Sequence, residues 1–246
     1  RDGAGEFIRW YGLHDFNASS FVTITLLLGL LHRERNGMGP RLENPQMASS
    51  VAVQTSRIAE FLATGEDVPR MGSANTATVP HRAFLCQDKR WLAVGVITDE
   101  QWRGLCKAID ATKLLEDPRF VTNPGRVKHR DECVGALAEI FRTETTEHWV
   151  SLIAKSGVPC GPINKVSEVV NDPQVLARNM IAEIEHPNVP DLKIPNSPLK
   201  LSESPSSVRR PPPLLGQHNE EVLQESGYTP DQIADLRDRG VVGGAA

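Results

Sequence analysis

The chain has 246 residues and a mass of 27.0 kDa, enough for one large domain or two small ones. Hydrophobic residues make up 39% and charged residues 24%, a composition typical of globular proteins, while only 5% are aromatic, so the core must be mainly aliphatic. The net charge of −4 disfavours a nucleic-acid-binding domain, which is normally basic, although it permits a local basic pocket.

The start of the chain resembles neither a signal peptide nor a membrane anchor. Residues 1–6 (RDGAGE) are polar, and the chain begins without methionine, so we expect a fragment, a processed chain or one part of a larger protein. The longest apolar-rich stretch, residues 21–31, has 11 residues. A membrane span needs about 20, so no membrane association is expected.

Residues 17–34 predict a long helix with apolar side chains around nearly its whole circumference. We therefore expect it to be buried on most sides. Asp15 and nearby short polar residues can cap its start, and Arg33 and Arg35 near its end suit the helix dipole. Asn36-Gly37 then ends it. Such a helix is typical of a layered α/β core.

Further elements follow from apolar spacing and turn residues. Helices are predicted at residues 45–63, 98–109, 129–142, 145–156, 166–170, 173–178, 220–226 and 230–239. Strands are predicted at residues 83–86, 91–96, 180–185 and 192–201, the last confined to an edge or split by its prolines. Thr98 and Gln101 have capping-box spacing. Residues 68–83 form a predicted loop, and residues 158–164 a turn-rich connector.

The four cysteines predict neither a metal site nor a disulfide framework. Cys86, Cys106, Cys133 and Cys160 are widely spaced and form no CxxC pair. We interpret them as small buried side chains in a reducing compartment.

Asp15 is the candidate catalytic residue, and residue type alone leaves two roles open. An aspartate at a helix start commonly satisfies free backbone N–H groups. Alternatively, the positive end of the helix dipole favours an ionised carboxylate there, and a carboxylate in a dry cleft can attack a thioester carbonyl to form a mixed anhydride.

Other candidates are less specific. His14 is either a neighbouring acid–base group or a structural side chain, and His81 is expected on an exposed loop. Arg209 and Arg210 are expected to be solvated, with a phosphate contact as the alternative. Residues 71–75 form either a flexible loop over a site or a plain surface loop. No phosphate-binding P-loop or dinucleotide fingerprint is present, so ATP and NAD chemistry have no support.

Residues 12–41 (GLHDFNASSFVTITLLLGLLHRERNGMGPR) favour the catalytic role for Asp15. This segment resembles the part of family III CoA-transferases (CaiB/BaiF, formyl-CoA:oxalate type) in which an aspartate leads an apolar helix that ends in LLxRExTGxGQ. In that family the leading aspartate is the catalytic nucleophile. Asp15 occupies its place, 18 positions before Arg33.

The resemblance extends along nearly the whole chain. Similar motifs follow in the family's order at residues 90–94 (RWLAV), 100–106 (EQWRGLC), 157–164 (GVPCGPIN), 172–175 (DPQV) and 211–218 (PPPLLGQH). Two motifs depart from the pattern. The turn continues as GPRLENP at residues 39–45 instead of a GQxVDVS strand, and residues 72–75 (GSAN) only loosely replace the glycine-rich lid.

The resemblance implies an α/β fold: part of a Rossmann-like large domain plus a smaller α+β domain, in the interlocked dimer of family III. It assigns residues 1–46 to the end of the large domain with the nucleophile helix, 47–68 to a linker helix, 69–176 to the small domain and 177–246 to a return to the large domain. The family's N-terminal half, which supplies most CoA contacts, is not in this sequence, so the CoA-binding residues are unknown.

The resemblance implies a cytoplasmic CoA-transferase that moves CoA from an acyl-CoA to a carboxylic acid through an aspartyl-CoA thioester. Coenzyme A is then a substrate, with no bound cofactor or metal, and the partner is a second copy or a chain that supplies the N-terminal half. The alternatives are a 2-methylacyl-CoA racemase of the same superfamily and a non-catalytic subunit or fragment. Racemases carry a glutamate at the place of Thr98, which favours transfer over racemisation.

Overall fold

The computed structural model describes residues 12–243 of the chain, which form two units. The first unit ends at Ile163 and the second begins at Asn164. The predicted division at residues 46, 68 and 176 stays a prediction, and residues 1–11 of its first part lie outside the described residues. Among residues 12–243, no helix combines the length and the apolarity that a membrane crossing requires.

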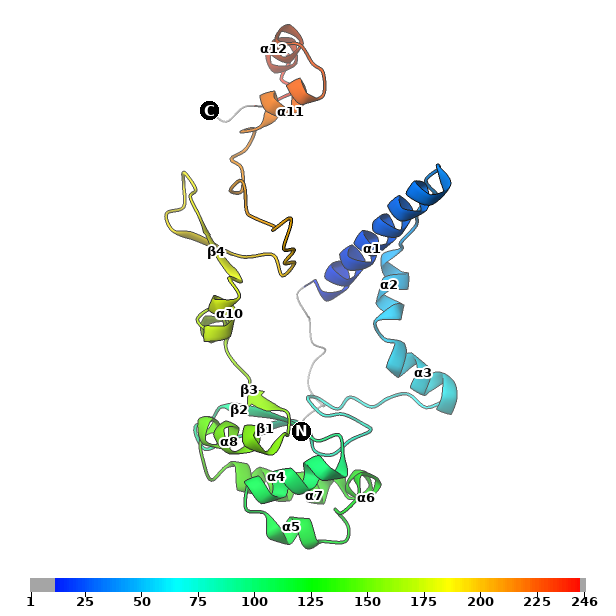
Figure 1. The fold of residues 1–246 in the computed structure, drawn as a ribbon, viewed down its shortest axis with the longest axis vertical. Coiled ribbons are helices and arrows are strands. Elements are labelled where there is room, and N and C mark those ends of the chain that lie inside the picture. Colours follow the sequence, from blue (N-terminus) through cyan, green and yellow to red (C-terminus); the bar gives the residue numbers. More distant parts are fainter. Residues whose placement is uncertain (1–11, 244–246) are drawn as a thin grey trace. The chain divides into compact units, whose positions relative to one another are not determined.

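The first unit begins with three helices, α1 (Leu13–Asn36), α2 (Gln46–Ala52) and α3 (Thr55–Thr64) (Figure 1). The predicted first helix is confirmed, and it starts four positions earlier than expected, after Gly12 in a left-handed conformation with φ of 63°. It ends as predicted at Gly37, where φ is 81° and the backbone N–H donates to the Arg33 carbonyl at 2.8 Å.

The prediction of one continuous helix over residues 45–63 is wrong, because the chain leaves the helix at Gln54 (φ −95°, ψ 13°). The break is stabilised by side chains that bond to backbone carbonyls. The Gln54 carboxamide donates to the Ser50 carbonyl at 3.0 Å, and the Thr55 hydroxyl donates to the Ala52 carbonyl. Such local side-chain bonds compete with helix continuation.

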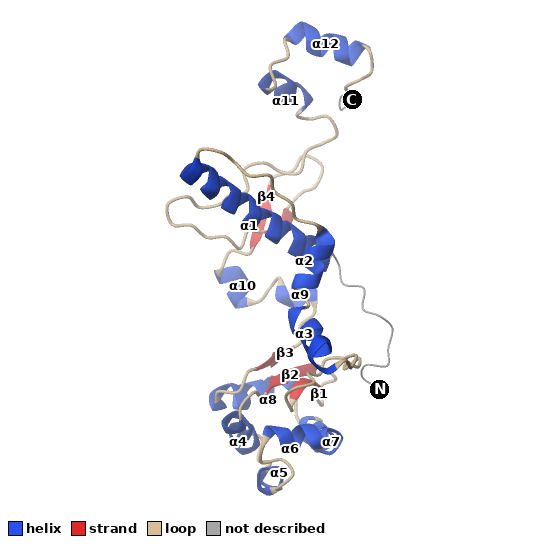
Figure 2. Ribbon diagram, turned by 90° about the vertical axis from the view of Figure 1, so that its right-hand side faces the viewer, coloured by secondary structure: helices blue, strands red, loops and turns tan. Residues whose placement is uncertain are grey.

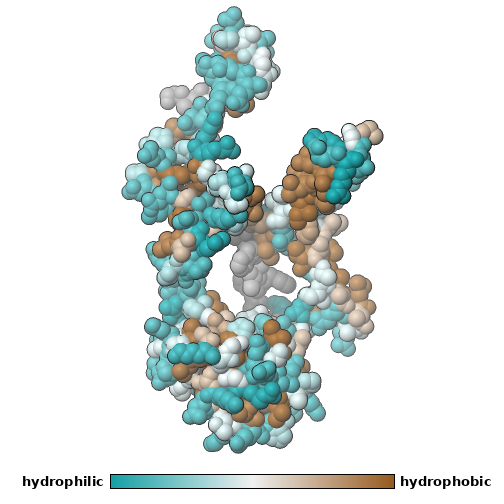
Figure 3. All heavy atoms as spheres, viewed as in Figure 1, coloured by the Kyte–Doolittle hydropathy of each residue, from teal (hydrophilic) through white to brown (hydrophobic). Residues whose placement is uncertain are grey.

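The expected burial of α1 is also wrong for the described residues. Gly29 is the one buried residue of this helix, while Phe16 is 69% exposed and Leu27 is 61% exposed. Figure 3 shows hydrophobic side chains along the surface of α1. Residues 37–45 and α2 contact only part of the circumference of α1. The apolar pattern predicts that a helix will be covered, but it does not identify the segment that covers it.

The rest of the first unit is a small α+β domain with an antiparallel sheet in the order β1-β2-β3. The strands are β1 (His81–Leu85), β2 (Trp91–Gly95) and β3 (Cys160–Pro162). Its helices are α4 (Asp99–Ala108), α5 (Thr112–Glu116), α6 (Asn123–Lys128), α7 (Arg130–Phe141) and α8 (Thr146–Ile153), followed by a 3₁₀ turn at Ala154–Ser156. These helices lie on one side of the sheet (Figure 2).

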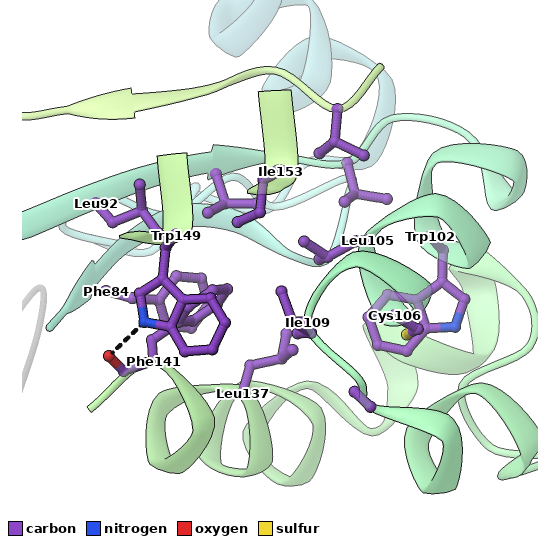
Figure 4. Close-up of a cluster of buried hydrophobic side chains, with 14 of the residues drawn as sticks. Phe84, Leu92, Trp102, Leu105, Cys106, Ile109, Leu137, Phe141, Trp149 and Ile153 are labelled. Carbon is purple, nitrogen blue, oxygen red and sulfur yellow. Dashed lines mark hydrogen bonds between the residues drawn. The ribbon is translucent and has the colours of Figure 1, made fainter. Parts of the chain in front are cut away.

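The core of the small domain lies between the sheet and these helices. The register pairs Phe84 with Leu92, so that both side chains face the same layer. Phe141 packs edge-on against Trp149, with ring centroids 5.5 Å apart, and the Trp149 indole donates to the Phe141 carbonyl at 3.0 Å (Figure 4). Buried Leu105 and Ile153 belong to the same cluster. The buried members of this aliphatic and aromatic cluster lie between Val79 and Val158.

Local sequence signals predicted most of these elements. Two short helices and one strand were not predicted. The helix at 98–109 is confirmed as α4, with the Gln101 N–H bonded to Thr98 Oγ1 at 3.2 Å in the predicted capping box. Helices α5 and α6 were not predicted. The connector at 158–164 contains β3, which pairs with β2.

Between residues 164 and 243, the second unit contains four short helices and a β-hairpin. Helices α9 (Val166–Val169) and α10 (Pro173–Ala177) precede strands β4 (Ile181–Ile184) and β5 (Leu192–Pro195), and α11 (Asn219–Glu225) and α12 (Pro230–Asp238) follow. All were predicted, but β5 ends at its first proline instead of reaching residue 201. This is the expected effect of a residue that cannot donate to a sheet.

Candidate active site

Asp15 lies in the first turn of α1, as its third helical residue. The N-cap position belongs to Gly12, which has no side chain with which to cap the helix. The carboxylate of Asp15 is exposed, and its Oδ1 accepts a hydrogen bond from Nε2 of Gln46 at 2.6 Å. The structure thus places Asp15 at the positive end of a 24-residue helix, with one oxygen held by a neighbouring helix.

Gln46 is the residue that the sequence analysis missed. It is the first residue of α2 and lies 31 positions from Asp15 along the chain. The only sequence signal was the start of a helix after Pro45, which says nothing about what its first side chain contacts. The pairing depends on residues 37–45 running back along α1.

The other predicted polar candidates have surroundings of their own. His14 is exposed on α1. The prediction that His81 lies on a loop is wrong, because it is the first residue of β1; there it is half-buried and lines a cavity of about 450 Å³ with Ala93 and Cys160. Arg210, which is exposed, pairs with the half-exposed Glu221 in the second unit at 2.6 Å, in keeping with the solvated role expected for Arg210.

The loop for which a flexible lid and a plain surface loop were both left open is partly bonded to the small domain. Arg130 donates to the carbonyls of Asn75 at 2.8 Å and Thr76 at 2.6 Å. Asn123 donates to the Ala77 carbonyl at 2.8 Å. Residues 75–77 of this loop are therefore held by α6 and α7.

The cysteines occupy the environments predicted for them, with one difference. Cys86, Cys106 and Cys133 are buried and free, whereas Cys160 is only half-buried. Burial raises the pKa of the Cys106 and Cys133 thiols to about 12. These two thiols are therefore protonated and unreactive at neutral pH. Among residues 12–243, no three histidine, cysteine or acidic side chains are grouped so that they could hold a metal ion.

Comparison with known proteins decides the family. The family model for CoA-transferase family III matches residues 3–219 of the chain. The chain belongs to CoA-transferase family III. Its motifs at residues 12–41 and 157–164 both lie inside the matched region.

Two curated relatives of this family III chain are transferases by name. An acyl-CoA transferase of Fusarium pseudograminearum (strain CS3096) is 32% identical over 233 residues, covering 94% of this chain and 51% of the relative. The succinyl-CoA:glutarate CoA-transferase of Homo sapiens is 34% identical over 218 residues, covering 88% of this chain and 50% of the relative. The chain thus spans about half the length of the curated relatives it matches.

Solved structures share the family III fold. A CAIB/BAIF family protein from Brucella suis aligns with a TM-score of 0.74 at 24% identity, covering 92% of this chain and 58% of that one. The predicted fold class, a mixed α/β architecture of family III, is therefore confirmed.

Proposed function

We propose that this chain serves an enzyme that transfers CoA from an acyl-CoA to a carboxylic acid, with Asp15 as the nucleophile. The observation that carries the proposal is the exposed carboxylate of Asp15 in the first turn of α1, within the region that the family III model matches. The curated relatives named above are CoA-transferases or acyl-CoA transferases, which supports the same reaction class.

The proposed reaction proceeds by covalent catalysis in two exchanges. Asp15 attacks the thioester carbonyl carbon and the C–S bond breaks. CoA departs as the thiolate, and Asp15 and the donor acyl group are then joined as a mixed anhydride. The thiolate then attacks the Asp15 carbonyl carbon, giving an aspartyl-CoA thioester and releasing the donor acid. The acceptor carboxylate repeats these steps in reverse order and departs as its CoA thioester. Each intermediate keeps the acyl group activated, so hydrolysis must be prevented by excluding water.

We further propose that α1 is covered by a partner in the working enzyme, either a second copy of the chain or a chain that supplies the family's N-terminal half. The supporting observation is the exposed apolar surface of α1, where Phe16, Leu27 and Leu28 are each more than half exposed. Contiguous exposed apolar surface of this kind marks interaction surfaces. A cytoplasmic location fits the reducing compartment inferred from the free cysteines.

Racemisation of a 2-methylacyl-CoA ester is the alternative reaction within the superfamily. It requires a second acid–base group, and the racemase glutamate is replaced here by Thr98, whose hydroxyl caps α4. A hydroxyl of ordinary acidity is unsuited to that proton transfer. Racemisation predicts deuterium uptake from heavy water at the α-carbon without an acceptor acid, whereas CoA transfer requires the acceptor.

The test compares Asp15→Asn with a matched control, Asp231→Asn, which alters an exposed first-turn acid of α12. Both variants are assayed in the full chain, alone and combined with a family N-terminal half. Succinyl-CoA and glutarate serve as the first substrates because the human relative is named for them. Loss of the nucleophile should lower CoA transfer by roughly 10³-fold or more, and the control should retain it. Full transfer by Asp15→Asn would refute the proposal.

A further inference from the structure

We propose that the Gln46 carboxamide is the hydrogen-bond donor for the Asp15 oxygen that becomes the carbonyl oxygen of the covalent intermediates. This inference rests on the proposed function and extends it to a second residue of the site. The geometry behind it is the 2.6 Å hydrogen bond from Gln46 Nε2 to Asp15 Oδ1.

The segment after α1 places Gln46 against Asp15. Residues 37–45 return along α1, and close contacts hold this segment to the helix. Asn44 donates to the Ala18 carbonyl at 3.2 Å, only one turn from Asp15. Farther along α1, Leu42 packs on Gly29 so closely that a Cβ there would lie 2.8 Å from the Leu42 side chain. The glycine leaves room for the Leu42 side chain against the helix.

The two oxygens of Asp15 have different surroundings. Oδ1 is held by Gln46, whereas Oδ2 faces Gly12. A Cβ at position 12 would lie 3.6 Å from Oδ2, an ordinary van der Waals distance, so Oδ2 lies beside the glycine while Gln46 occupies Oδ1. The geometry thus assigns Oδ2 to bond formation with the acyl carbon and keeps Oδ1 as the oxygen that remains on the Asp15 carbonyl.

This assignment gives Gln46 a role in the step that follows anhydride formation. When CoA thiolate attacks the Asp15 carbonyl carbon, negative charge develops on Oδ1, and the bond from that carbon to Oδ2 then breaks to release the donor acid. A fixed N–H donor at Oδ1 stabilises this charge, as an oxyanion hole does. The same donor acts again when the acceptor carboxylate attacks the aspartyl-CoA thioester.

The experiment replaces the donor and keeps the rest of the site. Gln46→Leu removes the carboxamide, and Gln46→Glu keeps its size but removes the N–H groups. Gln54→Leu is the matched control, because Gln54 also donates its carboxamide at 3.0 Å but to the Ser50 carbonyl, at the break between α2 and α3. All are compared with the unaltered full chain, alone or combined with a family N-terminal half, whichever supports CoA transfer. The readouts are steady-state kinetics and mass spectrometry of the Asp15–CoA adduct.

We expect both Gln46 variants to lower kcat by about 10²-fold while KM for the acyl-CoA changes by less than about twofold. The Asp15–CoA adduct should form correspondingly more slowly, and the Gln54 variant should match the unaltered protein. Thermal unfolding verifies that each variant is folded. Because both Gln46 variants lack the N–H donor, they should lower kcat to a similar extent.

An unchanged kcat in the Gln46 variants, with or without a raised KM, overturns the inference. If Asp15→Asn is inactive in the same assay, the proposed function remains intact. If Asp15→Asn itself retains transfer, the proposed function fails and this inference fails with it. The Asp15 variant therefore distinguishes the two failures.

Discussion

Arg126 donates a hydrogen bond from Nη2 to Oδ1 of Asp99 at 2.9 Å, from a side chain that has no solvent exposure. Its Nε bonds to the Val79 carbonyl at 2.7 Å and its Nη1 to the Phe120 carbonyl at 2.8 Å. The guanidinium also lies 4.9 Å from the ring centroid of Trp102. One arginine thus links α6, the first turn of α4 and the chain that enters β1.

Replacing this arginine should destabilise the small domain. Arg126→Ala leaves the carbonyls of Val79, Phe120 and Val121 without this donor and creates a cavity, so we expect the free energy of unfolding to fall by about 3 kcal/mol. Arg103→Ala, on the exposed side of α4, is the control and should change it by less than about 0.5 kcal/mol. Urea unfolding measures both. Equal effects would contradict the structural role of Arg126.

Two helical glycines should respond in opposite directions to alanine. A Cβ on Gly125 would lie 2.5 Å from the Arg119 carbonyl oxygen, so Gly125→Ala forces the backbone apart and should destabilise the protein. A Cβ on Gly135, inside α7, has no neighbour within 4 Å, so Gly135→Ala should stabilise by up to about 1 kcal/mol through helix propensity. Thermal unfolding of the pair tests the packing at α6, and shifts in the same direction would refute it.

Thiol labelling should find one accessible cysteine. Since burial raises the pKa of Cys106 and Cys133 to about 12, their thiolate fraction at pH 8 is about 10⁻⁴. Cys160 is half-buried and lines a cavity, so it should react first with a disulfide reagent. Cys160→Ser should remove the fast phase, and the other thiols should react on unfolding. A fast phase that survives this substitution would contradict the burial described here.

Asp88 should make stability depend on acid pH. Desolvation opposes ionisation, but hydrogen bonds from Thr146 and Arg90 outweigh it and hold the pKa of Asp88 below its ordinary 3.8. The carboxylate therefore stabilises the fold above pH 3.8, and this contribution is lost as the pH falls through the lowered pKa of the folded state. Asp88→Asn should flatten the acid side of the stability profile, measured by unfolding at several pH values. An unchanged slope would exclude this role.

Local chemistry explains what the sequence could predict. Thr98 with Gln101 forms the predicted capping box that begins α4, within four residues of chain. Gly37 likewise ends α1 where its neighbours indicated. The ends of these helices depend on adjacent residues, so they can be predicted from the sequence alone.

Non-local contacts explain what the sequence could not predict. Strand β3 exists because Cys160 pairs with Val94, far away in the chain. Arg126 is a residue type that is normally exposed, and its burial depends on carbonyls from separate segments. The motif located Asp15, but the Gln46 contact depends on the path of residues 37–45 along α1.

Oxygen tracing tests the central claim most directly. In the proposed reaction one oxygen of the acceptor acid stays on Asp15 after each turnover, because the acceptor carboxylate attacks the aspartyl thioester and CoA then takes the acyl carbon. With ¹⁸O-labelled acceptor acid, mass spectrometry of the peptide that contains Asp15 should therefore show a gain of ¹⁸O, and Asp231 should remain unlabelled. CoA transfer that proceeds with no ¹⁸O in the Asp15 peptide would contradict the account.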